Sequence, residues 1–160
     1  MPLKVYIETT IPSFYFEARR SPDCIARRNW TRQWWDDRRN EYELATSLVV
    51  HEELESPEYP AEKRRNALAL LGELPLLDLT SRIDQIVEEY VGNLLMPQQP
   101  TADAIHLALA SHYACDVLLT WNCIHLANPN KFRHIEHINK RLGLSVPAVV
   151  TPLQLLGELL

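Results

Sequence analysis

Short apolar segments alternate with longer helix-forming segments along most of this chain, and this alternation constrains the fold more than any other feature. Strands are expected at residues 3–7, 44–50, 76–79, 117–120 and 148–150. Helices are expected at 23–40, 61–71, 81–91, 101–114 and 131–142, with short ones beginning near 51 and 152. Strands separated by helices need crossover connections, and crossovers give a parallel sheet. We therefore expect an α/β fold, with a mainly parallel sheet of four to five strands and helices on both faces.

Length and composition are those of one ordinary globular domain, which we expect to span residues 1–160. The chain is 46% hydrophobic and 23% charged, unlike a disordered or fibrous protein, and it shows no repeat or linker. No apolar run approaches the roughly 18 residues that cross a bilayer, so we expect no membrane association and a cytoplasmic location. Cys24, Cys115 and Cys123 form no CxxC pair, and we expect buried free thiols.

Basic residues are concentrated in one segment of an otherwise acidic chain. The net charge of −5 argues against a protein that coats nucleic acid by bulk attraction. Seven of the 16 basic residues nevertheless lie between Arg19 and Arg39, interleaved with Trp30, Trp34 and Trp35. The tryptophans could stack on RNA bases, but their helical spacing also fits a core or an interface.

Acidic residues are expected at the ends of the strands, where a parallel sheet binds its ligands. With only four glycines the chain has neither GxGxxG nor a P-loop, so carboxylates holding a hard divalent cation remain as a way to handle phosphodiesters. Glu8 follows the first strand, Glu52 and Glu53 follow the second, and Asp103 begins an apolar helix after Thr101, its expected cap. Taken alone, Glu8 also fits a surface acid in a loop, and the other acids fit a helix N-terminus, where the dipole favours negative charge.

Four motifs, taken in order, carry a resemblance to a known family. YIETT ends the first strand, VVHEEL follows the second, ADAIHLALA opens a late helix and LLTWN follows the strand at 117–120. Together they resemble the PIN domain, especially its VapC-like toxin relatives, over nearly the whole chain. The resemblance implies a three-layer α/β fold and metal-dependent cleavage of RNA.

The resemblance also implies a set of site residues. Glu8, Glu53 and Asp103 correspond to the acids that hold one or two Mg²⁺ or Mn²⁺ ions, and Glu53 is preferred to Glu52 because Leu54 follows it. Asn122 stands where the family commonly has a fourth acid. Glutamate at position 8 is longer than the usual aspartate, and Asn122 provides a carbonyl oxygen without charge. Supporting hydroxyl groups are expected from Thr9 and Thr120.

The implied reaction is hydrolysis of an RNA phosphodiester bond by the toxin of a toxin–antitoxin pair. An antitoxin segment would occupy the acidic groove, and a homodimer is also implied. Arg27, Arg28 and Arg32 are candidate contacts for RNA phosphates or for an acidic antitoxin, although a solvated helix face is an equal alternative.

Other readings of the same residues stay open. His106 lies one helical turn after Asp103 and could reach the site, or it could be a hydrogen-bonded core residue. The other histidines match no zinc spacing. The domain could be a binding module of the same fold whose metal site has decayed through Asn122. A haloacid dehalogenase type phosphatase would need two aspartates after the first strand, where this chain has Glu8-Thr9-Thr10.

Overall fold

The computed structural model describes residues 1–99 and 101–157 of the protein. Within them the strands form one parallel sheet in the order β2-β1-β3-β4. The strands are β1 (Lys4–Ile7), β2 (Glu43–Ala45), β3 (Val117–Leu119) and β4 (Ala148–Val150). In the central pairing Val5, Tyr6 and Ile7 lie beside Val117, Leu118 and Leu119. The expected α/β fold with a four-stranded parallel sheet is therefore confirmed.

Helices connect the strands, as parallel pairing requires. They are α1 (Thr10–Tyr15), α2 (Pro22–Arg38), the 3-10 turn η1 (Arg39–Glu41), α3 (Leu48–Leu54), α4 (Ala61–Leu71), α5 (Ser81–Gly92), α6 (Ala102–His112), α7 (Pro129–Arg141) and α8 (Pro152–Leu156). Gly72 and Gly143 follow α4 and α7 with φ angles of 51° and 72°, which glycine adopts without strain. Thr101 is the N-cap residue of α6, as expected, but its side chain makes no cap hydrogen bond.

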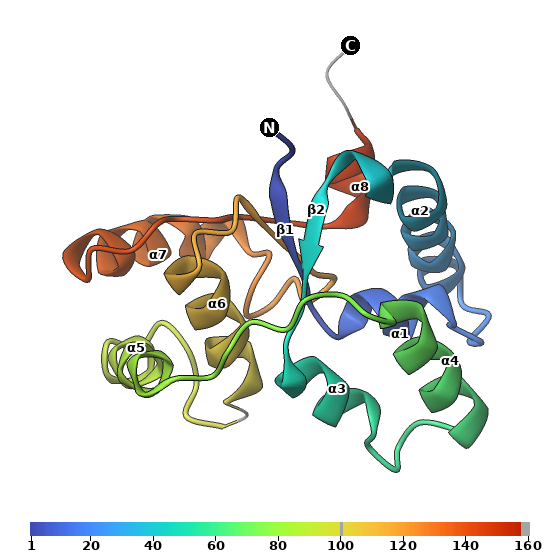
Figure 1. Ribbon diagram of the computed structural model, residues 1–160, viewed down its shortest axis with the longest axis horizontal. Coiled ribbons are helices and arrows are strands. Elements are labelled where there is room, and N and C mark those ends of the chain that lie inside the picture. Colours follow the sequence, from blue (N-terminus) through green and yellow to red (C-terminus); the bar gives the residue numbers. More distant parts are fainter. Residues whose placement is uncertain (100, 158–160) are drawn as a thin grey trace.

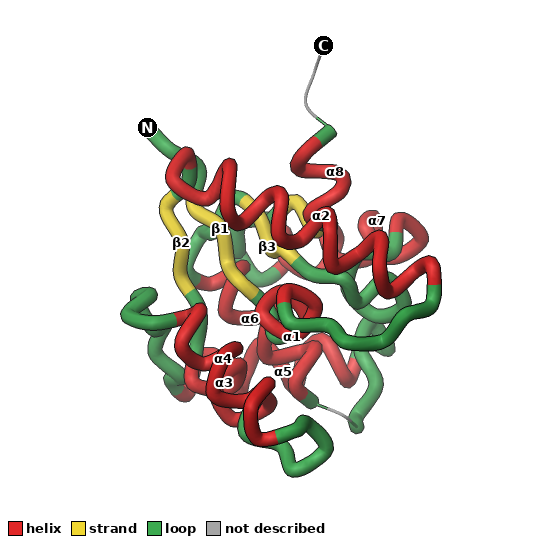
Figure 2. Tube along the Cα trace, turned by 90° about the vertical axis from the view of Figure 1, so that its right-hand side faces the viewer, coloured by secondary structure: helices red, strands yellow, loops and turns green. Residues whose placement is uncertain are grey.

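The helices lie on both sides of the sheet, which gives three layers. Figure 1 shows α5, α6 and α7 on one side of the strands and α1, α2 and α8 on the other. Helices α1 and α3 follow β1 and β2 at the edge where these strands end. Seen from the side, α2 runs across the strands and α1 lies beside α4 (Figure 2). The loops at the carboxyl edge of the sheet are thus surrounded by α1, α3 and α6.

Two expected strands differ from the structure. The expected strand 44–50 stops at Ala45, and α3 begins at Leu48, because Val50 and Leu54 lie four residues apart and are buried together as a helix places them. The expected strand 76–79 is reduced to a single bridge between Leu76 and Thr46. Apolar runs this short do not by themselves distinguish a strand from a helix or a bridge.

The core lies around β1, whose Val5, Tyr6 and Ile7 are fully buried. Trp34 and Trp35 also belong to this core, so their side chains are not available to stack on RNA bases. None of the helices in the described ranges is long and apolar enough to cross a membrane.

The cysteines are free, as expected, but they are not all buried. Cys24 and Cys115 are buried, whereas Cys123 is exposed. Cys123 follows Asn122 in the loop after β3, and this loop lies at the protein surface.

Candidate active site

The two central strands bring their following residues together at one edge of the sheet. Glu8 comes directly after β1 and Thr120 directly after β3. The backbone N–H of Glu8 donates to the Leu119 carbonyl at 3.2 Å, and that of Thr120 donates to the Val150 carbonyl at 3.0 Å, so both residues continue the hydrogen bonding of the sheet. Residues 112 positions apart in the sequence therefore meet because parallel strands end at the same edge.

Glu8 is a buried carboxylate surrounded by hydroxyl and amide donors. One carboxylate oxygen accepts from the Thr120 hydroxyl at 2.8 Å, from the Thr10 backbone N–H at 2.9 Å and from the Thr10 hydroxyl. Burial raises the pKa of Glu8, although the charge of His106 and these hydrogen bonds act in the opposite direction. The hydroxyl of Thr120 thus supports a candidate metal ligand, as expected. Thr10, which was not expected, contributes two of the contacts.

Glu53, and not Glu52, faces the site. Its carboxylate accepts from the Thr9 hydroxyl at 2.6 Å and lies 2.7 Å from Nε2 of His106, whereas Glu52 is exposed. Burial acts to raise the pKa of Glu53, but the hydrogen bond and the charge of His106, together with the Thr9 hydrogen bond, outweigh it, so the pKa is lowered. Thr9 thus contacts a proposed metal ligand directly.

Asp103, at the beginning of α6, completes the set of carboxylates. The residue is 8% exposed, and burial raises the pKa of its carboxylate, with a smaller contribution from the charge of Glu53. The charges of His106 and His125 and a hydrogen bond from Asn122 lower that pKa. Asp103 is therefore linked to Glu53 by charge and to the loop after β3 by a hydrogen bond.

Asn122 lies at this edge, but its carbonyl oxygen is not turned toward the carboxylates. That oxygen accepts from the backbone N–H groups of Ile124 and His125 at 3.2 and 3.0 Å, which forms the turn after β3. The expectation that the amide oxygen points to an ion does not match this arrangement. The Asn122 backbone N–H donates to the Thr120 hydroxyl at 2.9 Å, so Thr120 orients both Glu8 and Asn122.

His106 is the residue that the sequence identified least clearly. It is fully buried, with Nε2 against Glu53 and Nδ1 2.7 Å from the Tyr6 hydroxyl. The Tyr6 hydroxyl also lies 2.8 Å from the Ser47 hydroxyl. Burial acts to lower the pKa of His106, but the Glu53 hydrogen bond and the charges of Glu8, Glu53 and Asp103 raise it. The only sequence signal was its position one turn after Asp103.

The donor chemistry of these residues fits a hard divalent cation, which prefers carboxylate oxygens. Within residues 1–99 and 101–157, however, no group of three or more His, Cys, Asp or Glu side chains is close enough to hold an ion as arranged. Glu53 is paired with His106 instead. For the three carboxylates to share an ion, side chains at this edge would have to rotate.

The three candidate arginines of α2 have different surroundings. Arg27 lies over the rings of Phe14 and Trp121, with distances of 5.7 and 5.3 Å from its guanidinium carbon to the ring centroids. Arg32 donates to the Tyr15 carbonyl at 2.7 Å, and Arg28 contacts its neighbour Asn29 at 3.4 Å. Of the three, Arg27 is the one in contact with the loop that follows β3.

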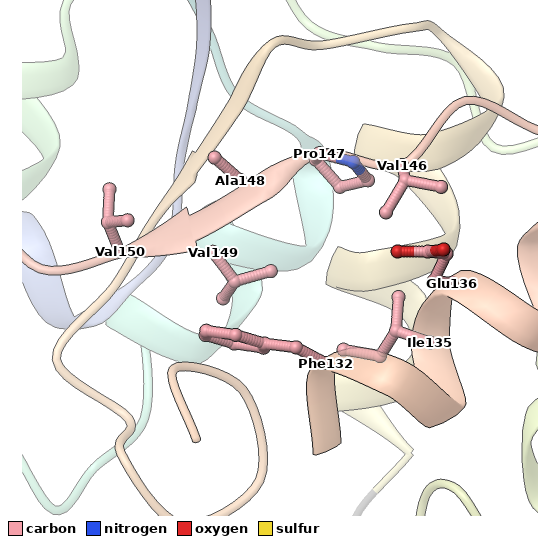
Figure 3. A pocket seen from close by; sticks show the side chains of 8 residues that line it. All are labelled: Phe132, Ile135, Glu136, Val146, Pro147, Ala148, Val149 and Val150. Atoms are coloured by element: carbon pink, nitrogen blue, oxygen red, sulfur yellow. The ribbon is translucent and has the colours of Figure 1, made fainter. Parts of the chain in front are cut away.

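Two depressions differ in their relation to this edge. A pocket of about 320 Å³ between α7 and β4 is mostly apolar, with Phe132 and Val149 facing one another and Glu136 at one side (Figure 3). It contains none of the expected site residues. A groove of about 560 Å³ between α1 and the beginning of α4 includes Thr10, which contacts Glu8.

Comparison with known proteins supports the fold. No protein-family model and no curated protein sequence matches the chain. Among solved structures, the chain is similar to a chain in the crystal structure of VapBC2 from Rickettsia felis bound to a DNA fragment from their promoter. The TM-score is 0.53 at 10% sequence identity, over 93% of this chain and 98% of that chain. The fold is PIN-like.

Proposed function

We propose that this protein is a divalent-metal-dependent ribonuclease that acts as the toxin of a toxin–antitoxin pair. The observation that carries the proposal is that Glu8, Glu53 and Asp103, which come from three distant parts of the sequence, are all influenced by the charge of the buried His106. Buried carboxylates repel one another unless a cation or a proton compensates their charge. The PIN-like fold is consistent with this chemistry.

Glu8, Glu53 and Asp103 are the residues that would hold Mg²⁺ or Mn²⁺. When bound, such a cation lowers the pKa of a water molecule and stabilises negative charge on phosphate oxygens. Thr10 and Thr120 orient the Glu8 carboxylate, and Thr9 orients Glu53. Hydrogen bonds of this kind fix the direction of a ligand and tune its charge.

Two more residues prepare the site. His106 offsets the charge of the carboxylates and holds Glu53 in place. Asn122 donates to Asp103, so that the acid at the beginning of α6 is fixed to the loop after β3. Both act on the protein's own carboxylates and position them for the substrate.

An antitoxin protein is the partner that we propose. The structural neighbour is described as a VapBC2 assembly on promoter DNA, and the similarity in fold extends over almost the whole chain. In this proposal an antitoxin segment covers the edge of the sheet that carries Glu8, Glu53 and Asp103, which we call the carboxylate edge, and so blocks RNA. A homodimer of this chain is a further part of the proposal.

The proposal is tested with Glu8→Gln and Asp103→Asn, each of which removes one charge with little change in volume. We expect either change to abolish Mn²⁺-dependent cleavage of single-stranded RNA and to leave the thermal unfolding transition cooperative. Glu52→Gln is the matched control, since the Glu52 side chain is exposed. Full cleavage by either site variant would contradict the assignment of these residues.

A binding module of the same fold is the second candidate function. It is favoured by the carbonyl oxygen of Asn122, which is engaged in its own loop, and by the pairing of Glu53 with His106. Metal-dependent cleavage distinguishes the two functions. A binding module would bind RNA or protein without any Mn²⁺-dependent loss of the RNA.

A further inference from the structure

Arg27 is held in a fixed position on an aromatic surface. Its guanidinium group lies over both Phe14 and Trp121, at distances typical of cation–π contacts. Trp121 is itself fixed, because its indole N–H donates to the Thr31 hydroxyl at 2.7 Å, and that hydroxyl donates to the Arg27 carbonyl at 2.6 Å. We call Phe14, Arg27 and Trp121 the Arg27 platform.

The charge of Arg27 is not neutralised by an ion pair. Arg19, Arg38 and Arg141 each pair with a glutamate, but no carboxylate in the described part of the chain lies within ion-pair distance of Arg27. The exposed Asp23, one helical turn earlier, interacts with Arg27 by charge alone. A guanidinium group that is already oriented loses little freedom when it binds a phosphate, and its planar donors match phosphate oxygens. Arg27 is thus suited to bind an anion.

The platform directly adjoins the carboxylate edge. The backbone N–H of Trp121 donates to the Thr10 hydroxyl at 2.8 Å, and that same hydroxyl contacts Glu8. Trp121 also lies between Thr120 and Asn122 in the sequence. An anion on Arg27 would therefore be a neighbour of a group placed at Glu8.

The groove between α1 and α4 lies next to the Arg27 platform. Thr10 and Phe14 line it, with Tyr59 as a second aromatic side chain and Arg19 and Lys63 as cations. Its volume of about 560 Å³ is in the range of pockets that bind small organic ligands. We call it the α1–α4 groove, and Figure 2 shows its two helices side by side.

Charge within the groove is nearly balanced. Glu17 accepts two hydrogen bonds from the Arg19 side chain, and Lys63 lies 3.8 Å from it. Glu58 also lines the groove, so two acids offset two cations. Arg19 and Lys63 lie over the rings of Phe14 and Tyr59, with distances of 6.0 and 5.1 Å to the ring centroids. A base that stacks on either ring would therefore displace one of these long, flexible side chains, while Arg27, which contacts the groove residue Phe14 from α2, supplies the charge. Bases stack on aromatic side chains in this way in single-stranded nucleic acids.

We propose that the Arg27 platform and the α1–α4 groove form a subsite for single-stranded RNA beside the carboxylate edge. Arg27 binds a backbone phosphate, and the groove takes the neighbouring nucleotide against Phe14 and Tyr59. An acidic peptide could pair with Arg27 but would make no use of two aromatic walls. This inference rests on the proposed ribonuclease function and names how that site holds its substrate.

The test is binding of a fluorescein-labelled 12-nucleotide oligouridylate, measured by fluorescence anisotropy in EDTA, so that no cleavage occurs. We expect Arg27→Gln to weaken binding roughly tenfold and to reduce the slope of log K against log salt by about 0.7, the value for one lost phosphate contact in a single strand. Phe14→Leu keeps an apolar side chain without a flat ring, and we expect binding to weaken severalfold.

Arg39→Gln is the matched control. Arg39 also lies over a tryptophan, at 4.5 Å from the Trp35 ring, and it follows the far end of α2. The Arg39→Gln variant loses the same charge and the same kind of aromatic contact as Arg27→Gln. We expect its affinity for the oligouridylate to stay within twofold of that of the unchanged protein. If Arg27→Gln does not fold, Arg27→Lys replaces it: retention of charge with loss of the planar donors should weaken binding severalfold.

Several results would overturn the inference. The first is that the unchanged protein does not bind the oligouridylate at low salt. The second is that the folded Arg27 variant binds RNA as tightly as the unchanged protein. The third is that Arg39→Gln weakens RNA binding as much as the Arg27 variant does. Binding of a labelled dodecaglutamate peptide is measured in the same way. If Arg27→Gln loses peptide binding but keeps RNA binding, the platform binds a protein partner instead of RNA. Because binding is measured without metal, absence of cleavage alone would contradict only the ribonuclease proposal.

Discussion

Glu52 and Glu53 are neighbours in sequence, yet only one of them belongs to the candidate site. Successive residues of an α-helix point about 100° apart. Leu54 and Val50 are buried, which fixes the orientation of α3 and turns Glu53 toward Thr9 and His106. The preference for Glu53 came from the following leucine, so burial of one apolar residue determines the position of the acid before it.

This difference gives the first residue-scale prediction. Glu53→Gln should lower Mn²⁺-dependent RNA cleavage at least tenfold, in line with the effect of disturbing a metal ligand's surroundings, whereas Glu52→Gln should change it less than twofold. Initial cleavage rates of both variants at equal protein concentration give the comparison. A larger loss in Glu52→Gln would mean that α3 is turned differently from the structure.

Asn122 leads to a second residue-scale prediction. Because its side chain donates to Asp103, Asn122→Asp places a second negative charge against a carboxylate whose pKa is already raised by burial. We expect the metal-free variant to be less stable by roughly 1–2 kcal/mol, since like charges then replace a hydrogen bond. We also expect Mg²⁺ to bind more tightly, because ligand charge helps to set divalent-ion affinity.

Urea unfolding in EDTA and a Mg²⁺ titration of cleavage measure the two effects of Asn122→Asp. Asn122→Ser, which adds no charge, is the control for loss of the amide. An unchanged Mg²⁺ midpoint in the aspartate variant would place residue 122 outside the influence of the ion.

Elements that end at the carboxyl edge were predictable because each carries a strong local pattern. The strand β1, buried except for Lys4, and the helix α4 lie almost where the sequence predicts them. The apolar run that begins at Leu44 predicts a strand, but α3 begins four residues later, at Leu48. An apolar run alone does not show where the strand ends and the helix begins. Contacts such as that of His106 with Glu53 depend on where α3 and α6 pack, and no local pattern contains that information.

In the segment between α1 and α2, the buried Glu17 lies 3.8 Å from Lys63 of α4, and this contact gives a prediction at the scale of elements. Hydrogen bonds from Arg19 lower the pKa of Glu17 from 4.5 to about 2. The folded state therefore binds this proton less tightly than the unfolded state, so the contribution of Glu17 is complete above about pH 4.5 and is lost as the pH falls toward 2. Arg19 is largely exposed, and solvent screening limits the contribution to about 1 kcal/mol.

We expect Glu17→Gln to be less stable than the unchanged protein at pH 7 by about this amount and nearly equal to it near pH 2.5. Urea unfolding at several pH values between 7 and 2.5 measures the difference. Glu62→Gln, at an exposed position at the beginning of α4, controls for a general change in charge. A difference that does not shrink with falling pH would mean that Glu17 stabilises the segment by packing instead of by charge.

At the scale of the whole molecule, a cation bound at the carboxylate edge should stabilise the entire fold. Glu8 follows β1, Glu53 lies in α3 and Asp103 begins α6, so one ion would connect a central strand with helices from different parts of the chain. A ligand that binds only the folded state adds about 2.7 kcal/mol at 100 times its Kd. For a domain of this size, each kcal/mol raises Tm by roughly 2–4 °C.

We therefore expect saturating Mn²⁺ to raise Tm by about 5–10 °C, measured by calorimetry against EDTA. Glu8→Gln and Asp103→Asn should each lose most of this increase. Their metal-free Tm values should be equal to or above that of the unchanged protein, because each substitution removes a buried charge whose pKa burial has raised. The loss of the Mn²⁺ effect and the unchanged or higher metal-free Tm have one cause. Repulsion among the carboxylates destabilises the metal-free protein, and a bound cation relieves that same repulsion. An increase of Tm that persists in both variants would show that Mn²⁺ binds elsewhere on the molecule, and the carboxylates would then be stabilised by His106 and their hydrogen bonds, without a cation.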